Sequence, residues 1–244
     1  MTTLHFRDYE CVESTNTLAL EMARAGEPEG TVISARTQKR GRGRREHGWW
    51  DDPGMSVLIS MILVPGDHMA EFSQLAFAAS LGVAELLETC FGITPQLKWP
   101  NDVLAGGRKI AGVLVETTKS DQGWRAVVGI GLNVNQRSFP RQLSTATSVR
   151  IETGRVSDVR ELARQLAEYV MAHYSRWLDL GFEEMASDWR KYMWGVGKQA
   201  RVLMNGSDIC GEITGIDANG RLLIRDADGR TASVTAADSV QIDE

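Results

Sequence analysis

The sequence contains little cysteine and no long uninterrupted apolar run. Three cysteines in 244 residues stand far apart without paired spacing, so neither a disulfide framework nor a zinc site can be read from them. We expect all three, Cys11, Cys90 and Cys210, to be small buried hydrophobic residues. The N-terminus lacks a basic segment followed by an apolar one, and the apolar stretch around Val57 to Val64 contains Ser60 and is too short to span a bilayer. We therefore expect a cytoplasmic protein without a membrane partner.

An excess of basic charge is also absent. The formal net charge of -5 argues against a protein that covers nucleic acid or anionic lipid with its whole surface, so any anion site must be local. Hydrophobic residues at 43% and charged residues at 24% are ordinary for a globular protein, and no internal repeat is present. The length allows one catalytic core and a small second domain.

The spacing of apolar residues predicts a mixed α+β protein. Helices are expected from about Ser14 to Gly26, Met69 to Thr89, Ser157 to Trp177 and Phe182 to Tyr192. Strands are expected at Thr31 to Thr37, Met55 to Val64, Gln96 to Trp99, Val113 to Thr117 and Ala126 to Leu132. The loop between the first two strands is too long and polar for a tight hairpin, and such loops often carry function.

The pattern changes at Gly195-Val196-Gly197, where two glycines in three residues indicate a linker. Short alternating strands follow at Ala200 to Met204, Ile209 to Ile216, Leu222 to Arg225 and Thr231 to Val234, separated by turns that contain glycine. We therefore expect two domains, residues 1–194 with a mixed sheet flanked by helices and residues 195–244 as a small β-barrel.

A basic tract lies in the long loop. Six basic residues and no acidic residue occur between Arg36 and Arg45, in a chain that is acidic overall. Gly41 and Gly43 let the backbone approach a ligand, and arginine side chains can bind phosphate oxygens in a bidentate manner. Taken alone, the tract fits a phosphate clamp and a solvated or nucleic-acid-binding basic loop equally well.

A second cluster runs from Lys98 to Asp102 and is followed by a turn that contains Lys109. Pro100 fixes a turn that places Asn101 and Asp102 at the end of a strand, and the next turn returns Lys109 to the same edge. The alternative is that Asp102 caps a turn and Lys109 is exposed to solvent. Together with the basic tract, the cluster favours a site for an anionic substrate.

These segments, in their order along the chain, resemble biotin protein ligases. The motifs that carry the resemblance are Glu13-Ser14-Thr15-Asn16, Gln38 through Arg45, Lys98 to Asp102, Arg108 to Gly112 and Gly129-Ile130-Gly131-Leu132-Asn133. The resemblance covers nearly the whole chain. It implies a catalytic domain like that of class II aminoacyl-tRNA synthetases and biotin ligases, with an SH3-like barrel at the C-terminus. Because only a dozen residues precede the first motif, we expect the short form without a DNA-binding domain.

The resemblance implies a two-step ligase reaction with biotin and ATP as substrates and Mg²⁺ as the metal. Biotin is activated as biotinyl-5'-AMP with release of pyrophosphate, and a lysine of a biotin carboxyl carrier domain then displaces AMP. The implied partner is this carrier domain of a carboxylase, and nucleic acid is not expected as a partner. The sheet edges of the fold make a homodimer possible.

Site residues follow from the resemblance position by position. The implied biotin contacts are Ser14, Thr15, Asn16, Gln38, Gly41, Arg42, Gly43, Arg44, Lys109 and Gly112. The implied nucleotide contacts are Arg44, Arg45, Trp49, Asn101, Gly131 and Asn133. Arg44, Lys109 and Asp102 are the implied catalytic residues, with Asp102 also a possible metal ligand. Ser14 and Thr15 could instead cap a helix, Trp49 could belong to the core, and Gly112, Gly129 and Gly131 could form ordinary turns or bulges.

One departure from the family pattern lies in the basic loop, where Glu46 and His47 replace the usual glycine and arginine. The change predicts weaker retention of the adenylate, which restoring both residues and measuring adenylate dissociation would test. The alternatives are a lipoate or octanoate ligase or transferase of the related fold and a non-catalytic biotin-binding protein.

Overall fold

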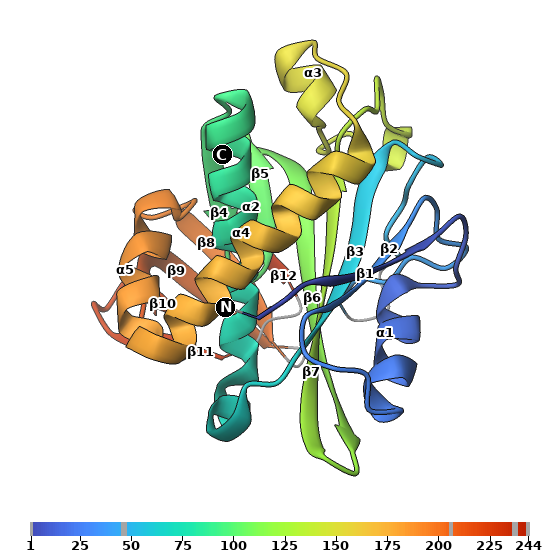
Figure 1. Cartoon of the computed structure of the whole chain (residues 1–244). Helices are drawn as coiled ribbons and strands as arrows, with labels where there is room; N and C mark the ends of the chain where they lie inside the picture. Colours follow the sequence, from blue (N-terminus) through green and yellow to red (C-terminus); the bar gives the residue numbers. More distant parts are fainter. Residues whose placement is uncertain (1, 45–47, 205–206, 236–238, 243–244) are drawn as a thin grey trace.

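A computed structural model describes residues 2–44, 48–204, 207–235 and 239–242 (Figure 1). The helices are α1 (Thr15–Arg24), α2 (Leu75–Phe91), α3 (Val149–Thr153), α4 (Val159–Leu180) and α5 (Phe182–Tyr192), with 3-10 helices at Gly66–Gln74 and Arg141–Leu143. The strands are β1 (His5–Tyr9), β2 (Thr31–Ala35), β3 (Ser56–Leu63), β4 (Pro95–Lys98), β5 (Asp102–Ala105), β6 (Arg108–Ser120), β7 (Gly123–Asn133), β8 (Gln199–Met204), β9 (Ser207–Ile216), β10 (Leu222–Arg225), β11 (Thr231–Val234) and β12 (Ser239–Ile242).

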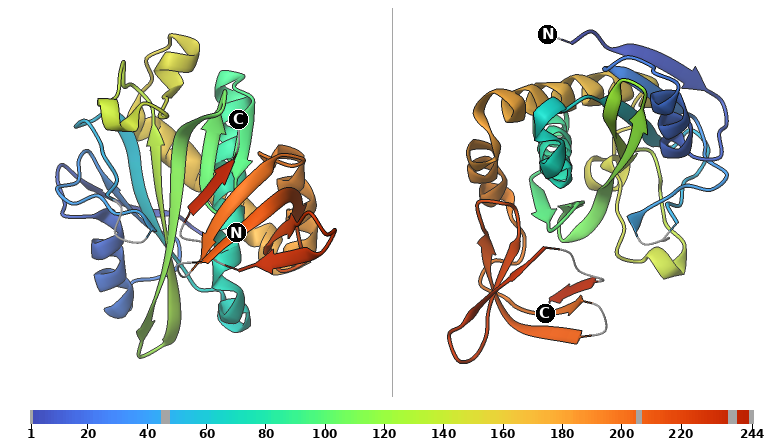
Figure 2. Two further views of the ribbon diagram at one scale, coloured as in Figure 1. Left: turned by 180° about the vertical axis from the view of Figure 1, so that it is seen from behind. Right: turned by 90° about the horizontal axis from the view of Figure 1, so that it is seen from below.

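The larger part of the chain is built on a seven-stranded sheet in the order β1-β2-β3-β7-β6-β5-β4. Strands β1 and β2 pair in parallel, and all the other pairs in this sheet are antiparallel. Helices pack against the sheet, as the apolar periodicity predicts (Figures 1 and 2). The mixed sheet flanked by helices is therefore confirmed.

The two faces of the sheet are covered by different helices. Alternate residues of β3 separate into two clusters, with Met61 packed in the core that includes α2 and α4 and Ile62 packed with Leu20 of α1. Because side chains along a strand alternate between faces, α1 lies on the face opposite to α2 and α4. Every residue of β3 is buried as a consequence.

The helix termini follow the capping residues that the sequence offers. The Asp158 side chain accepts hydrogen bonds from the backbone N–H groups of Arg160 and Glu161 at 2.9 and 3.1 Å, which starts α4. Ser14 lies at the N-cap of α1 in an extended conformation, but its side chain makes no capping hydrogen bond. The hydroxyl of Ser14 is therefore not used by the helix.

One helix differs from the expectation that it would run regularly from Met69. Residues Gly66–Gln74 form 3-10 helix with a non-helical residue at Glu71, and α2 begins only at Leu75. The segment Glu71–Phe91 is long and apolar enough to cross a membrane by length and composition, a feature that the apolar runs of the sequence did not reveal. Because 72% of its most apolar 18-residue window is buried inside the protein, the segment is explained as a core helix.

The C-terminal part is a five-stranded antiparallel sheet in the order β11-β10-β9-β8-β12, which lies beside α5 in Figure 2. Its apolar residues belong to the same buried cluster as the larger sheet. The Trp99 indole N–H donates a hydrogen bond of 2.9 Å to the carbonyl oxygen of Gly220, and a Cβ on Gly220 would lie 2.9 Å from the ring of Phe182. The β9–β10 turn is therefore seated directly on the larger part.

Several short elements were not expected from the sequence, namely β1, β5, β12 and α3. Each has only four or five residues, which is too few to show a clear period. The expectation of three buried cysteines was also wrong, since Cys11 and Cys210 are exposed and Cys90 is only half-buried.

Candidate active site

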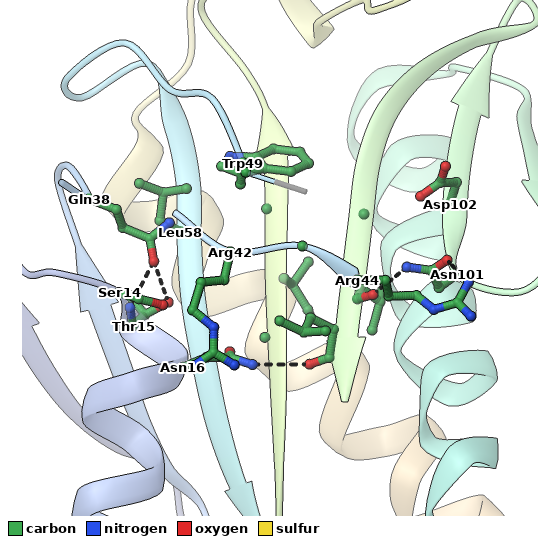
Figure 3. A pocket seen from close by; sticks show the side chains of 18 of the residues that line it. Ser14, Thr15, Asn16, Gln38, Arg42, Arg44, Trp49, Leu58, Asn101 and Asp102 are labelled. Carbon is green, nitrogen blue, oxygen red and sulfur yellow. Dashed lines mark hydrogen bonds between the residues drawn. The ribbon is translucent and has the colours of Figure 1, made fainter. Parts of the chain in front are cut away.

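A cavity of about 220 Å³ lies on the α1 face of the seven-stranded sheet. Its wall is formed by the N-terminus of α1, the loop between β2 and β3, and the central strands. Figure 3 shows Thr15 and Gln38 on one side, Asn101 and Asp102 on the other, and Trp49 between them. Segments that are far apart in the sequence therefore meet around one hollow.

Two cross-strand rows of the sheet lie beneath this cavity, and all their residues except Lys98 and Ser60 line it. The first row, from β3 to β4, is Leu58, Gly131, Gly112, Asp102 and Lys98. The second row, from β3 to β6, is Ser60, Gly129 and Leu114. Directly opposed residues in antiparallel strands point to the same face, so both rows project towards the cavity side. The register of the sheet is what aligns the separate motifs.

Glycine in these rows leaves room for large side chains above the sheet. A Cβ on Gly129 would lie 1.9 Å from Asn16 Oδ1, and a Cβ on Gly131 would lie 2.4 Å from the ring of Trp49. Such contacts are far inside van der Waals distance, so no other residue fits without displacing Asn16 or Trp49. The two glycines serve close packing in the site and are not ordinary turn residues.

One end of the cavity is a neutral hydrogen-bond network. Gln38 Oε1 accepts hydrogen bonds from the Thr15 backbone N–H at 2.7 Å and from the Thr15 hydroxyl at 3.0 Å. Ser60 Oγ lies 2.8 Å from Thr15 Oγ1 and 2.6 Å from Asn16 Oδ1. Thr15, Asn16 and Ser60 are at most 4% exposed. This end can pair with an uncharged polar group that offers both donors and acceptors.

The opposite end carries charge. Lys109 Nζ lies 2.6 Å from Asp102 Oδ1 and 5.9 Å from the centre of the Trp49 ring. Lys98, opposite Asp102 in the β4–β5 hairpin, is partly buried, and this burial lowers the pKa of its amine. Asp102 raises the pKa of Lys98 and Lys109 lowers it further, so the three groups share one electrostatic environment. Two cations and a carboxylate lie together, as the sequence predicted.

Arg44 and Asn101 join this cavity to a second one. Arg44 Nη1 donates a hydrogen bond of 3.4 Å to Asn101 Oδ1, and Asn101 Nδ2 donates one of 2.6 Å to the Val113 carbonyl oxygen. Both residues also line a cavity of about 400 Å³ that includes Arg221 of the C-terminal sheet. An extended ligand in the first cavity could therefore continue towards the junction of the two parts.

The structure brings most of the expected site residues to the first cavity. Those that line it are Ser14, Thr15, Asn16, Gln38, Arg42, Gly43, Arg44, Trp49, Asn101, Asp102, Lys109, Gly112 and Gly131. Gly41 and Asn133 do not line it. The Gly41 carbonyl oxygen accepts the Trp49 backbone N–H at 2.9 Å, and buried Asn133 donates to the Thr147 carbonyl oxygen at 3.0 Å. Arg45, Glu46 and His47 lie outside the described residues, so the expectations for them stay predictions.

Sequence reasoning missed residues that reach the site from the middle of strands. Ser60 was noted only as an interruption of an apolar run, although a buried serine in such a run is itself a signal of a polar site. Glu116 of β6 was not identified at all. Its carboxylate accepts hydrogen bonds from Asn16 at 3.0 Å and from Arg42. No local motif marks Glu116, because its partners lie 74 and 100 residues away in the sequence.

The chain matches two protein-family models. The profile of the biotin/lipoate A/B protein ligase family matches residues 9–133, and that of the biotin protein ligase C-terminal domain matches residues 195–238. Among curated proteins, the chain is 32% identical over 236 residues to a biotin--acetyl-CoA-carboxylase ligase of Mycobacterium tuberculosis, covering 94% of this chain and 86% of that protein. It is also 32% identical over 229 residues to the bifunctional ligase/repressor BirA of Bacillus subtilis, covering 92% of this chain and 70% of BirA.

Solved structures give the same result. The biotin protein ligase from Aquifex aeolicus in complex with biotin and ATP superimposes with a TM-score of 0.86 at 28% sequence identity, covering 98% of this chain and 99% of that one. The apo structure of the Aquifex ligase superimposes with a TM-score of 0.84 at 25% identity. By its sequence, its fold and the composition of its cavity, the chain belongs to the biotin protein ligase family.

Proposed function

We propose that this chain is an ATP-dependent biotin ligase that uses the first cavity for both of its steps. In the first step, a carboxylate oxygen of biotin attacks the α-phosphorus of ATP, biotinyl-5'-AMP forms and pyrophosphate leaves. In the second step, the amine of a carrier lysine attacks the acyl carbon, an amide bond forms and AMP leaves. The observation that carries the proposal is the pairing of a neutral polar end with a cationic end in one cavity.

The neutral end suits the ureido ring of biotin. A ureido group has one carbonyl acceptor and two N–H donors, and Ser14, Thr15, Asn16 and Gln38 offer hydroxyl and amide groups of both kinds. The Ser14 hydroxyl is not used as a helix cap, so it can bond a ligand. Ser60 belongs to the same group of side chains, and its hydroxyl also holds Thr15 and Asn16 in position.

The cationic end suits the carboxylate and the transferring phosphate. Arg44 and Lys109 supply fixed positive charge where negative charge develops on the phosphorus oxygens and on the leaving group, which is an effective form of transition-state stabilisation. Asp102 holds Lys109 in place through the 2.6 Å contact. We assign Arg44 and Lys109 to catalysis, and Asp102 to orienting Lys109 and the metal-bound nucleotide.

Trp49 and Asn101 are assigned to the nucleotide side. The Trp49 ring lies over Gly131, and its buried indole N–H has no hydrogen-bond partner among the described residues. A buried donor without a partner is costly, and an acceptor on the ligand would satisfy it. Asn101 lines both cavities, which suits contact with the phosphate chain.

The residues fit magnesium that arrives together with ATP. Asp102 is the one carboxylate among the described residues that line the first cavity, and the described part of the chain has no cluster of three or more His, Cys, Asp or Glu side chains that could hold a metal alone. Mg²⁺ is commonly bound by one or two carboxylates and substrate phosphates. Asp102 would supply the protein ligand, and the ion would offset charge on the phosphates.

The protein partner in this proposal is a biotin carboxyl carrier domain of a carboxylase, which provides the acceptor lysine. The relatives named as biotin--acetyl-CoA-carboxylase ligases support this class of acceptor. A cytoplasmic location, a homodimer and the absence of a nucleic-acid partner remain predictions from the sequence.

A lipoate or octanoate substrate is disfavoured by the neutral end. An alkyl chain or dithiolane ring would leave the hydroxyl and amide groups of buried Thr15, Asn16 and Ser60 and of half-buried Gln38 without ligand partners. Sites built to bond a polar group reject analogues that lack it for this reason. Lipoate is therefore expected to compete poorly with biotin.

The test is pyrophosphate release that requires both ATP and biotin, followed by a mass increase of one biotinyl group on a purified carrier domain. Lipoate and octanoate serve as competitors, and the Lys109→Met variant is the control for the first step. If pyrophosphate is not released, the ligase proposal is wrong; if it is released without transfer, the chain forms the adenylate but does not modify the carrier.

A further inference from the structure

Glu116 lies on β6 beside the neutral end of the cavity. Its Oε2 accepts a hydrogen bond of 3.0 Å from Asn16 Nδ2, and its Oε1 accepts one from Arg42 Nη2. The Glu116 side chain is 25% exposed and that of Arg42 39%. One carboxylate thus connects the first turn of α1, the central sheet and the basic loop.

The contact with Arg42 ties the loop between β2 and β3 to the sheet beside the cavity. Arg42 comes from the segment between β2 and β3, and its second nitrogen, Nη1, donates a hydrogen bond of 3.1 Å to Thr17 Oγ1. Arg42 also forms an isolated bridge with Gly48 across the loop. The guanidinium is therefore fixed at both terminal nitrogens, to α1 and to β6, and the two loop residues that follow Arg42, Gly43 and Arg44, line the cavity.

The hydrogen bond between Glu116 and Asn16 determines which end of the Asn16 amide faces the ligand. An ionised carboxylate only accepts hydrogen bonds, so Glu116 must face the amide nitrogen of Asn16. The same nitrogen lies 3.3 Å from the Leu114 carbonyl oxygen. Asn16 Oδ1 is consequently directed to Ser60 Oγ at 2.6 Å and lies above Gly129 in the floor of the cavity.

We infer that Glu116 is a positioning residue for biotin and biotinyl-adenylate, which holds the Arg42 loop closed over the ligand and fixes the Asn16 amide as an acceptor towards the cavity. This inference rests on the proposed biotin ligase function and adds a residue to it. Folding alone does not account for the arrangement, because a partly exposed ion pair contributes little to stability. Glu116 acts on ligand retention through Arg42 and Asn16.

The first experiment compares Glu116→Gln with Glu212→Gln. A glutamine at 116 has one acceptor and one donor end, so it can bond either Asn16 or Arg42 but must place its amide N–H groups against the other. Glu212 forms a comparable pair with Arg225 at 3.0 Å in the C-terminal sheet, with side chains 32% and 49% exposed. It is the matched control for loss of an arginine–glutamate pair away from the cavity.

The measurements are the dissociation rate of preformed biotinyl-adenylate, the KM for biotin, kcat for pyrophosphate release, and thermal melting. Glu116→Gln is expected to raise the dissociation rate and the KM by about tenfold, equivalent to ~1.4 kcal/mol, with kcat at saturating biotin within about twofold of the wild type. Glu212→Gln should leave both the dissociation rate of the adenylate and the KM for biotin unchanged. Unchanged dissociation and KM in a folded Glu116→Gln protein would overturn the inference, whereas a wild type that releases no pyrophosphate would overturn the ligase function itself.

A second experiment separates the two contacts of Glu116. If Arg42 acts through Glu116, the Arg42→Gln/Glu116→Gln protein should lose adenylate no more than about twofold faster than the worse single variant, because coupled residues are not additive. If the increases in dissociation rate of the two single variants multiply in the double variant, Arg42 and Glu116 act independently. This result would overturn the loop-closing part of the inference.

Discussion

The two ends of the first cavity are built on the same sheet but from different kinds of side chain. At the neutral end, Thr15, Asn16 and Ser60 are at most 4% exposed and bond to one another. At the charged end, the side chains of Lys109 and Asp102 are 38% and 25% exposed and pair across adjacent strands. The first end is buried and uncharged, while the second remains open to water.

The difference separates recognition from chemistry. Buried polar groups bind tightly only a ligand that replaces every hydrogen bond, so the neutral end should set specificity and KM. Charged groups near water can stabilise a changing charge and respond to pH, so the second end should set kcat and the affinity for ATP. Changes at each end should therefore affect different kinetic constants.

The largest effect is expected at the charged end. Lys109→Met removes one fixed cation beside the reacting groups, and kcat for pyrophosphate release should fall by about 100- to 1,000-fold. Biotin binding measured by calorimetry without ATP should change much less. A kcat close to that of the wild type would show that Lys109 does not stabilise the transition state.

The Gly129→Ala substitution places a methyl group in the floor of the neutral end. The new Cβ would lie 1.9 Å from Asn16 Oδ1, so Asn16 must move and the network with it. Overpacking of this kind costs ~1–3 kcal/mol, which should raise the KM for biotin by about tenfold while kcat changes little. Steady-state kinetics with a melting curve to verify folding provides the measurement, and a normal KM would contradict the close packing described for Asn16.

Ser60→Ala removes a single hydroxyl from the same end. Thr15 and Asn16 lose a shared partner at a fully buried position, which should cost ~1–2 kcal/mol in the free energy of unfolding. The KM for biotin should rise by roughly fivefold, since the network that positions Thr15 and Asn16 is loosened. Urea denaturation and steady-state kinetics together test this; a stability loss with an unchanged KM would limit Ser60 to a structural role.

A smaller, pH-dependent effect is expected from Lys98. Burial lowers the pKa of Lys98 below its ordinary value of 10.5, so its charge is lost at lower pH than that of an exposed lysine. As the pH rises through this lowered pKa, the charged end loses the positive charge of Lys98, and the KM for ATP should rise roughly threefold. The unfolded chain keeps the proton up to pH 10.5, so the free energy of unfolding should increase with pH over the same interval.

The control for this prediction is the Lys98→Met variant. Its KM for ATP should be higher than that of the wild type at neutral pH and should not rise further at alkaline pH. The KM for biotin should stay flat in both proteins, because Thr15, Asn16, Gln38 and Ser60 do not titrate there. If the KM for biotin rose at alkaline pH in the same way as the KM for ATP, the separate roles assigned to the two ends would be contradicted.

The sequence by itself determined the elements whose signals are local. Helices α1, α4 and α5 have clear apolar periods, and α4 also has a capping residue in Asp158. The expected limits of all three agree with the structure within a few residues. The motif residues from Ser14 to Asn16 and from Asn101 to Lys109 were identified because each motif is contiguous in the chain. Their chemistry follows from residue type.

Only the tertiary structure decided how these residues combine. The pairing of β3, β7, β6, β5 and β4 places Leu58, Gly131, Gly112, Asp102 and Lys98 in one row, although they are spread over more than 70 residues of sequence. Ser60 and Glu116 enter the site through strand register. Asn133, at the end of β7, is instead bonded to the Thr147 carbonyl oxygen, and Gly41 lies in the loop between β2 and β3 outside the cavity lining. Residue type is local, whereas the face and the neighbour of a strand residue depend on long-range pairing.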